Sequence, residues 1–86
     1  RSGSIERLTV ARGAAAAHEP LSALPYSASA HVATVLRGPF LLAPSNDLLL
    51  RPGDIIILIG AQAELDKLAG WFTGQRPGAS SLATSA

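Results

Sequence analysis

The sequence has no cysteine and only two histidines, His18 and His31. Without thiols the chain can form no disulfide, thiolate metal site or cysteine nucleophile, and two histidines are few for a zinc site. Charge is also scarce, because seven Lys and Arg stand against six Asp and Glu, and the basic residues are scattered along the chain. We therefore expect no metal, no resident cofactor and no nucleic-acid partner.

Long hydrophobic runs are missing as well. The longest uncharged stretch, residues 20–36, is interrupted by Pro25, and the run at 55–63 is far shorter than the about 20 residues of a transmembrane helix. The chain is therefore expected to be soluble and not to insert into a membrane itself. It also lacks methionine, which indicates a piece of a larger protein, and residues 1–3 are interpreted as a remnant of cloning.

Apolar residues, by contrast, are plentiful. They make up 48% of the 86 residues, with a mean hydropathy of +0.29, so we expect one domain folded around a single small core. A domain of this size buries only about 60–65% of the surface of its unfolded chain, which leaves it marginally stable alone. The apolar excess therefore predicts an interface, and we expect a homodimer.

Four segments are predicted to be strands, at residues 5–10, 30–37, 40–43 and 55–59. The third returns antiparallel to the second across the Gly38-Pro39 turn. The fourth consists of five aliphatic residues, so it is predicted to be central, covered on both faces and ended by Gly60. It follows the tight turn Arg51-Pro52-Gly53-Asp54, in which the Asp54 carboxylate is expected to cap free amides.

Two segments are predicted to be helical. Pro20 suits the first turn of a short helix over 18–24, and the spacing of Leu65, Leu68, Ala69 and Phe72 predicts an amphipathic helix over 61–72. Residues 74–86 have no periodicity and are expected to be a flexible tail. The order strand, helix, three strands, helix predicts an α+β fold, with helices packed on a small antiparallel or mixed sheet of about four strands.

Candidate functional residues are few. No side chains fall in a catalytic spacing, so an enzyme is not expected. His31, at the mouth of the second strand, can donate to a ligand or be an ordinary surface histidine. Arg37 can bind a phosphate or form an ion pair with Asp47 or Asp54, and the ion pair is the favoured alternative. Trp71 is the candidate for a partner interface.

Three segments, in one order and spacing, carry a family resemblance. They are residues 32–38, which end in Arg37-Gly38; residues 44–60, which contain Pro52-Gly53-Asp54 before the aliphatic strand; and residues 64–68. They resemble the TrkA-C family, also called RCK-C, the C-terminal subdomain of regulators of potassium conductance. The likeness covers most of residues 5–72, and we assign residues 4–73 to such a domain.

The resemblance implies a cytosolic, dimerising regulatory domain of a potassium channel, a potassium uptake system or a cation:proton antiporter. Such domains bind a small effector at or near the dimer interface, and in some members the effector is cyclic di-AMP. The resemblance places ligand-binding residues at Ala30, His31 and Val32, with Pro44 after the next strand, and Arg37 is added as a candidate for a phosphate. The loop before Ala30 lacks the arginine that meets the phosphates in those members.

Three hypotheses follow from these patterns. The first is a regulatory domain controlled by cyclic di-AMP or another nucleotide. The second is a purely structural assembly domain that dimerises its parent protein without a small-molecule ligand. The third is a small β-rich adaptor outside the family, which the absence of a short helix between the first two strands would favour.

Overall fold

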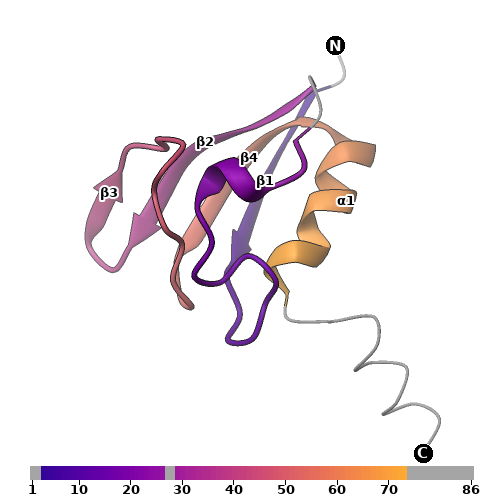
Figure 1. Cartoon of the computed structure of the whole chain (residues 1–86). Coiled ribbons are helices and arrows are strands. Elements are labelled where there is room, and N and C mark those ends of the chain that lie inside the picture. Colours follow the sequence, from indigo (N-terminus) through magenta and orange to yellow (C-terminus); the bar gives the residue numbers. More distant parts are fainter. Residues whose placement is uncertain (1–2, 27–28, 74–86) are drawn as a thin grey trace, which may run out of the picture.

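The structure of the chain is a computed structural model that describes residues 3–26 and 29–73. Its elements, in chain order, are β1 (Gly3–Thr9), the 3₁₀ helix η1 (Leu21–Ala23), β2 (Ala30–Arg37), β3 (Phe40–Leu42), β4 (Ile55–Ala61) and α1 (Gln62–Phe72) (Figure 1). The predicted order of one strand, a short helix, three strands and a helix is confirmed. The bounds 18–24 predicted for the short helix are wrong, because Pro20 is extended and pairs with Leu49, so the helix is limited to residues 21–23. The tail predicted at residues 74–86 lies outside the described residues.

The four strands form one antiparallel sheet in the order β1-β4-β2-β3. β4 is central, as its aliphatic run predicts, and pairs with β1 on one side and β2 on the other. β2 and β3 form the predicted hairpin, and Gly38 in its turn has a φ of +59°, a conformation that glycine adopts without strain. The prediction of an α+β fold is confirmed, and every strand pairing is antiparallel.

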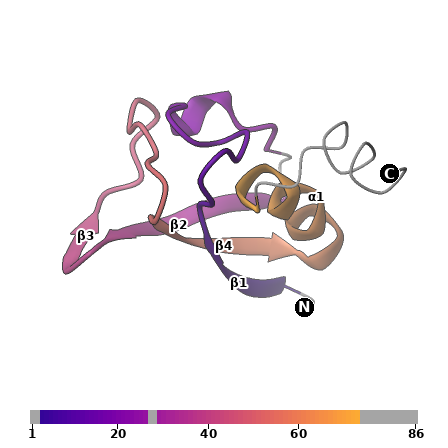
Figure 2. The same cartoon turned by 90° about the horizontal axis from the view of Figure 1, so that it is seen from below.

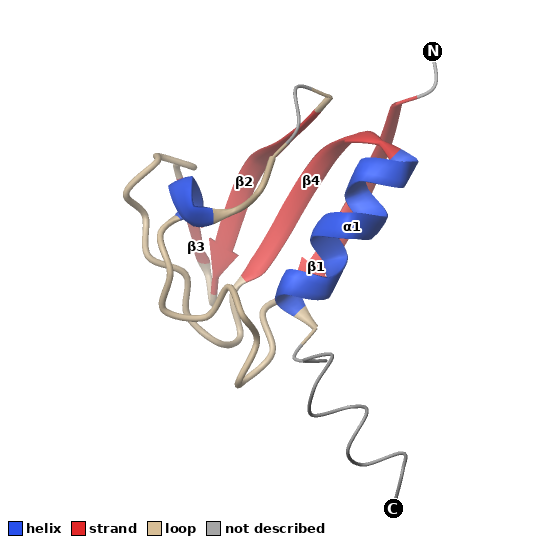
Figure 3. Cartoon of the chain, turned by 45° about the vertical axis from the view of Figure 1, so that its right-hand side comes forward, coloured by secondary structure: helices blue, strands red, loops and turns tan. Residues whose placement is uncertain are grey.

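Both helices lie on the same face of the sheet. Figures 2 and 3 show α1 on the side that also carries the η1 segment, and α1 packs against β1 and β4. The predicted apolar stripe of α1 faces the sheet, with Leu65, Leu68 and Phe72 buried. Ile56 and Leu58 of β4 meet this stripe and are fully buried. The core therefore lies between one face of the sheet and a single layer of helices and loops.

The prediction that the central strand is covered on both faces is wrong. Along β4, buried residues alternate with half-buried ones, because the helices cover only one side of the sheet. We call the other side the open face; its apolar residues, which are paired across neighbouring strands, are Ile5, Leu36, Leu41, Ile55, Ile57 and Ile59. Ile5 and Leu41 are each 73% exposed. No element of the described chain covers this face, and the homodimer stays a prediction.

The prediction that Gly60 ends the central strand is also wrong, because β4 continues to Ala61. A β-carbon at position 60 would lie 2.7 Å from the Cα atom of Ala30 and still closer to the carbonyl oxygen of Ser29. β2 can therefore begin close against β4 only because position 60 carries no side chain. The glycine marks a close approach of two backbones rather than the end of a strand.

Candidate functional site

A pocket of about 230 Å³ lies where β2 begins. We call it the β2 pocket, and its lining residues are Leu21, Tyr26, Ala30, His31, Val32, Pro44 and Asn46. Ala30, His31 and Val32, which the resemblance places at the effector site, thus share one cavity with Pro44. Four of the five candidate ligand-binding residues come together, and they do so from two separate segments of the chain.

Backbone hydrogen bonds hold two walls of the β2 pocket together. The amide of Leu21 in η1 donates to the carbonyl oxygen of Leu48 at 3.0 Å, and the amide of Ser22 donates to that of Asn46, also at 3.0 Å. These bonds tie η1 to the loop that follows β3. The third wall is the start of β2, whose position against β4 depends on Gly60. The pocket is therefore built on backbone contacts rather than on flexible side chains.

The walls of the β2 pocket are mostly apolar. Leu21, Ala30 and Val32 are buried, and Pro44 is exposed. Tyr26, His31 and Asn46 are the polar residues of the lining, and the described lining includes no lysine or arginine. His31 pairs with Ile59 and is exposed between the buried residues Ala30 and Val32, so its side chain lies on the opposite side of β2 from theirs. A planar ring with hydrogen-bonding edges, such as a nucleobase, fits these walls better than a phosphate does.

Tyr26 is a lining residue that the sequence analysis does not single out. Its ring packs against the core, and its hydroxyl is buried with no hydrogen-bond partner among the described residues. Burial raises the pKa of Tyr26 to about 12, so the phenol keeps its proton at neutral pH. The signal available in the sequence is the position of the chain's one tyrosine, just before the strand that carries three candidate ligand-binding residues.

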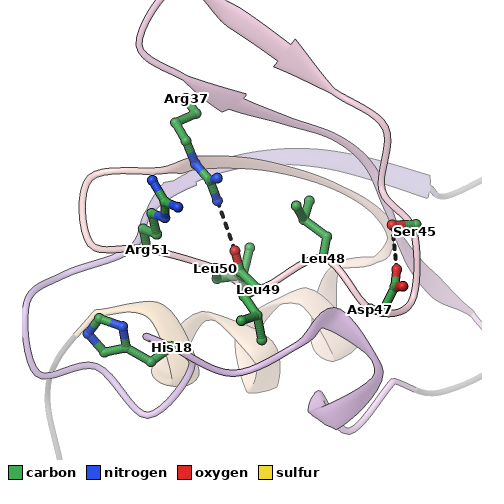
Figure 4. Close-up of a pocket in the computed structure, with 8 residues that line it drawn as sticks. All are labelled: His18, Arg37, Ser45, Asp47, Leu48, Leu49, Leu50 and Arg51. Atoms are coloured by element: carbon green, nitrogen blue, oxygen red, sulfur yellow. Dashed lines mark hydrogen bonds between the residues drawn. The ribbon is translucent and has the colours of Figure 1, made fainter.

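A second pocket, of about 470 Å³, lies beside the turn that precedes β4 (Figure 4). We call it the arginine pocket, and its lining residues are His18, Arg37, Ser45, Asp47, Leu48, Leu49, Leu50 and Arg51. Arg37, the fifth candidate ligand-binding residue, lines this pocket and not the β2 pocket. The reason is its position in β2, since Arg37 ends the strand that Ala30 begins.

Arg37 forms the ion pair that the sequence analysis favours, and its partner is Asp54. Its Nε donates to Oδ1 of Asp54 at 2.9 Å and its Nη2 to Oδ2 at 2.8 Å. Nη2 also donates to the carbonyl oxygen of Leu49 at 2.8 Å, as Figure 4 shows. The other candidate partner, Asp47, instead accepts a hydrogen bond from Ser45 at 3.0 Å. The guanidinium is thus committed to internal partners.

Asp54 is the buried member of this pair, with 2% of its side chain exposed against 26% for Arg37. Burial by itself would raise the pKa of the Asp54 carboxyl, but hydrogen bonds from Arg37 and from the backbone of Arg51 lower it overall. The amide of Arg51 donates to Oδ2 of Asp54 at 2.9 Å, so the predicted capping role of Asp54 in the turn is confirmed. The ion pair therefore locks the end of β2 to the turn before β4.

Trp71, the candidate for a partner interface, is half-buried and packs against the core. Its carbonyl oxygen accepts a hydrogen bond from the amide of Ala16 at 2.9 Å. The residue therefore helps to hold the loop after β1 against α1. Within the ranges that the structure describes, no helix is long and apolar enough to cross a bilayer, and no three side chains of His, Cys, Asp or Glu gather as metal ligands.

Comparison with known families decides where the chain belongs. The family model of the TrkA-C domain matches residues 5–73, which is well over half of the 86 residues. The chain belongs to the TrkA-C family. No curated protein matches the sequence. The matched range includes both pockets and all of α1, so the two sites described above are parts of the TrkA-C domain.

TrkA-C domains are regulatory rather than catalytic, and they occur in potassium and other cation transport proteins. This chain is therefore a regulatory domain of such a protein. The third hypothesis, a β-rich adaptor outside the family, does not hold, because the short helix between the first two strands is present as η1.

Proposed function

We propose that this TrkA-C domain is a cytosolic effector sensor that binds a nucleotide, with cyclic di-AMP as the first candidate, in the β2 pocket of a homodimer. The observation that carries the proposal is the gathering of Ala30, His31, Val32 and Pro44 around one cavity. Its apolar walls suit a purine ring, and its polar edge suits the hydrogen-bonding groups of the base.

The size of the β2 pocket supports a site shared between two copies. At about 230 Å³ it is smaller than the about 300–1,000 Å³ of complete small-molecule sites. A ligand with two bases related by a twofold axis would place one base in each of two identical pockets, as a symmetric dimer offers the same patch twice. The proposal therefore predicts one ligand for each pair of chains.

Such a site can control transport by linkage. A ligand shifts an equilibrium only when it binds one state more tightly than the other. A nucleotide in the β2 pocket would touch η1, the start of β2 and the loop after β3 at once, and in a dimer it would join two chains. It would thereby stabilise the arrangement of subunits in which both half-sites face the same ligand.

The test is isothermal titration of the domain with cyclic di-AMP, with ATP, AMP and cyclic di-GMP as comparisons. We expect saturable binding near one cyclic di-AMP per two chains. His31→Ala should weaken it by about threefold or more, since His31 borders the pocket at the rim where β2 begins and can donate to a ligand held between two copies. The matched control is His18→Ala, because this histidine lines the arginine pocket. Absence of heat from a folded dimer, or equal losses in both variants, would overturn the proposal.

A second candidate function, assembly without a ligand, is favoured by the open face. The apolar residues of this side of the sheet have no cover in the described chain, and Ile5 at its edge is 73% exposed. Arg7, His31 and Thr34 lie on the same side. A second copy of the chain is the occupant that the homodimer hypothesis names. Light scattering that gives the mass of a dimer, together with titrations that give no heat, would support this candidate in place of the sensor.

A further inference from the structure

Tyr26 lines the β2 pocket, and its hydroxyl, which is buried behind the surface of the pocket, is a polar group that the described fold leaves without a partner. Less than 1 Å² of this oxygen is exposed, and no described residue forms a hydrogen bond with it. A buried hydroxyl without a partner destabilises the free domain, because it has lost its hydrogen bonds to water without replacing them. Such a group in a native structure calls for an explanation.

We propose that the Tyr26 hydroxyl donates a hydrogen bond to a base of the bound nucleotide and is a specificity-determining residue of the β2 pocket. This inference rests on the proposed function, since it assumes a nucleotide in that pocket. The hydroxyl belongs to a lining residue of the cavity, beside Ala30 and His31. It is shielded in the free domain, so contact requires the ring to turn toward the ligand.

That movement breaks no hydrogen bond within the described chain, because the hydroxyl has none there to lose. Tyr26 follows Pro25 in the connection between η1 and β2, outside any strand or helix, so the sheet and α1 need not move with it. The binding of a ligand therefore gains a hydrogen bond at this site without breaking another, in exchange for part of the packing of the ring against the core.

The acceptor is assigned to the base rather than to a phosphate. The described lining of the β2 pocket includes no lysine or arginine to compensate a phosphate that has lost its water. A ring nitrogen of adenine accepts a hydrogen bond from a neutral phenol without that cost. Asn46, another residue of the lining, carries an amide of the kind that pairs well with the edge of adenine.

The test replaces Tyr26 with Phe, which keeps the ring and removes only the hydroxyl. We expect Tyr26→Phe to bind cyclic di-AMP about threefold to tenfold more weakly, the loss of one hydrogen bond. Its Tm should be unchanged or higher, because the hydroxyl has no partner in the free domain. The affinity for adenosine, which has the base without a phosphate, should fall by the same factor.

The matched control is Thr34→Val, which removes a hydroxyl that does have a partner. Thr34 Oγ1 donates to the carbonyl oxygen of Leu42 at 3.3 Å, and Thr34 does not line the β2 pocket. This variant should lower the Tm and leave the affinity unchanged. A Raman spectrum adds a direct readout, since the ring doublet of the chain's only tyrosine should change to that of a hydrogen-bond donor when the nucleotide binds.

The outcomes separate the two proposals. If the wild-type domain binds no nucleotide, the proposed function fails and the role of Tyr26 fails with it. If the wild type binds and Tyr26→Phe binds equally well, the proposed function stands and the inference about Tyr26 is overturned. A lower Tm in Tyr26→Phe would also overturn it, by revealing a partner in the free domain. A loss limited to ligands with phosphates would overturn the assignment of the acceptor to the base.

Discussion

The β2 pocket and the arginine pocket differ in how their polar groups are used. In the arginine pocket the guanidinium of Arg37 donates hydrogen bonds to the carboxylate of Asp54 and to the carbonyl oxygen of Leu49. In the β2 pocket the hydroxyl of Tyr26 has no partner within the described chain. The arginine that was a candidate for binding a ligand is therefore held by the fold itself, whereas the tyrosine hydroxyl is not.

This difference shows that the type of a side chain does not determine whether its hydrogen-bonding groups are available to a ligand. An arginine at the end of a strand can be a phosphate ligand or an ion-pair partner in the sequence, with the ion pair favoured, and a guanidinium held by a buried carboxylate is a structural element. A tyrosine beside a proline looks like packing, but its free donor can serve a ligand. The role that we propose for Tyr26 therefore depends on an unused hydrogen-bond donor and not on charge.

The largest effect that tests this comparison is expected from Asp54→Ala. The substitution leaves Arg37 without its ion-pair partner and the amide of Arg51 without its acceptor, so we expect it to lower the free energy of unfolding by about 3 kcal/mol. Urea denaturation measures this loss. Asp54→Asn, which keeps one acceptor, should lose less and provides a folded sample if Asp54→Ala does not fold.

Asp47→Ala is the matched control, because this exposed carboxylate lines the same pocket and is bonded only to Ser45 among described residues. Its effect should stay within about 0.5 kcal/mol. Losses of equal size for the two aspartates would contradict the assignment of the ion pair as the structural lock. Nucleotide affinity of the folded Asp54→Asn domain should match the wild type, since Asp54 does not line the β2 pocket.

The pH dependence of stability should report the same ion pair. The pKa of Asp54 is lower in the folded chain than in the unfolded chain, where it is about 3.9. The contribution of Asp54 to stability is therefore fully present above the unfolded pKa and is lost as the pH falls through the folded pKa. Acid titration of the unfolding free energy should give a shallower decline in Asp54→Asn, and identical curves would contradict this.

A smaller effect, of about 2 kcal/mol, is expected from Gly60→Ala. The added β-carbon would meet the backbone of Ser29 and Ala30, which cannot yield as a flexible side chain can. The start of β2 should therefore shift, and the affinity of the β2 pocket for its nucleotide should fall together with the stability.

Gly70→Ala is the control for that substitution. Position 70 lies in α1 and has nothing within 4 Å of an added β-carbon. Alanine favours the helix, so this variant should gain about 0.5–1 kcal/mol and keep its affinity. A Gly60→Ala domain with unchanged stability and binding would show that β2 does not depend on the close approach at position 60.

Local patterns were sufficient to predict the elements of the fold. The β-branched run of β4, the spacing of Leu65 and Leu68 in α1 and the Pro52-Gly53 turn each express a preference of neighbouring residues. The exposure of one face of β4 could not be predicted from its residues. It depends on where the helices pack on the sheet rather than on the sequence of β4 itself. The role of Gly60 could not be predicted for a similar reason. The backbone that approaches it, at Ser29 and Ala30, lies about thirty residues away in the sequence.

The residues of the candidate site were predicted only where the family resemblance named them. Ala30, His31 and Val32 are consecutive, so their common location needs no tertiary information. Pro44 joins them through the pairing of β3 with β2 and through the hydrogen bonds between η1 and the loop after β3. The role proposed for Tyr26 depends on the absence of a hydrogen bond within the described chain, and no pattern of residue types indicates such an absence.

The smallest change in the free energy of unfolding at neutral pH is expected for Tyr26→Phe relative to the wild type. The pKa of Tyr26 is raised to about 12 by burial, while an unfolded tyrosine ionises near a pKa of about 10. The wild type should therefore keep its full stability below pH about 10 and lose part of it as the pH rises toward the folded pKa, because only the unfolded chain then gains by ionising. Tyr26→Phe should lack this alkaline decline, which urea unfolding at a series of pH values measures. A decline of equal size in both chains would mean that another group causes it, and that the Tyr26 hydroxyl is not shielded in the way that distinguishes the β2 pocket from the arginine pocket.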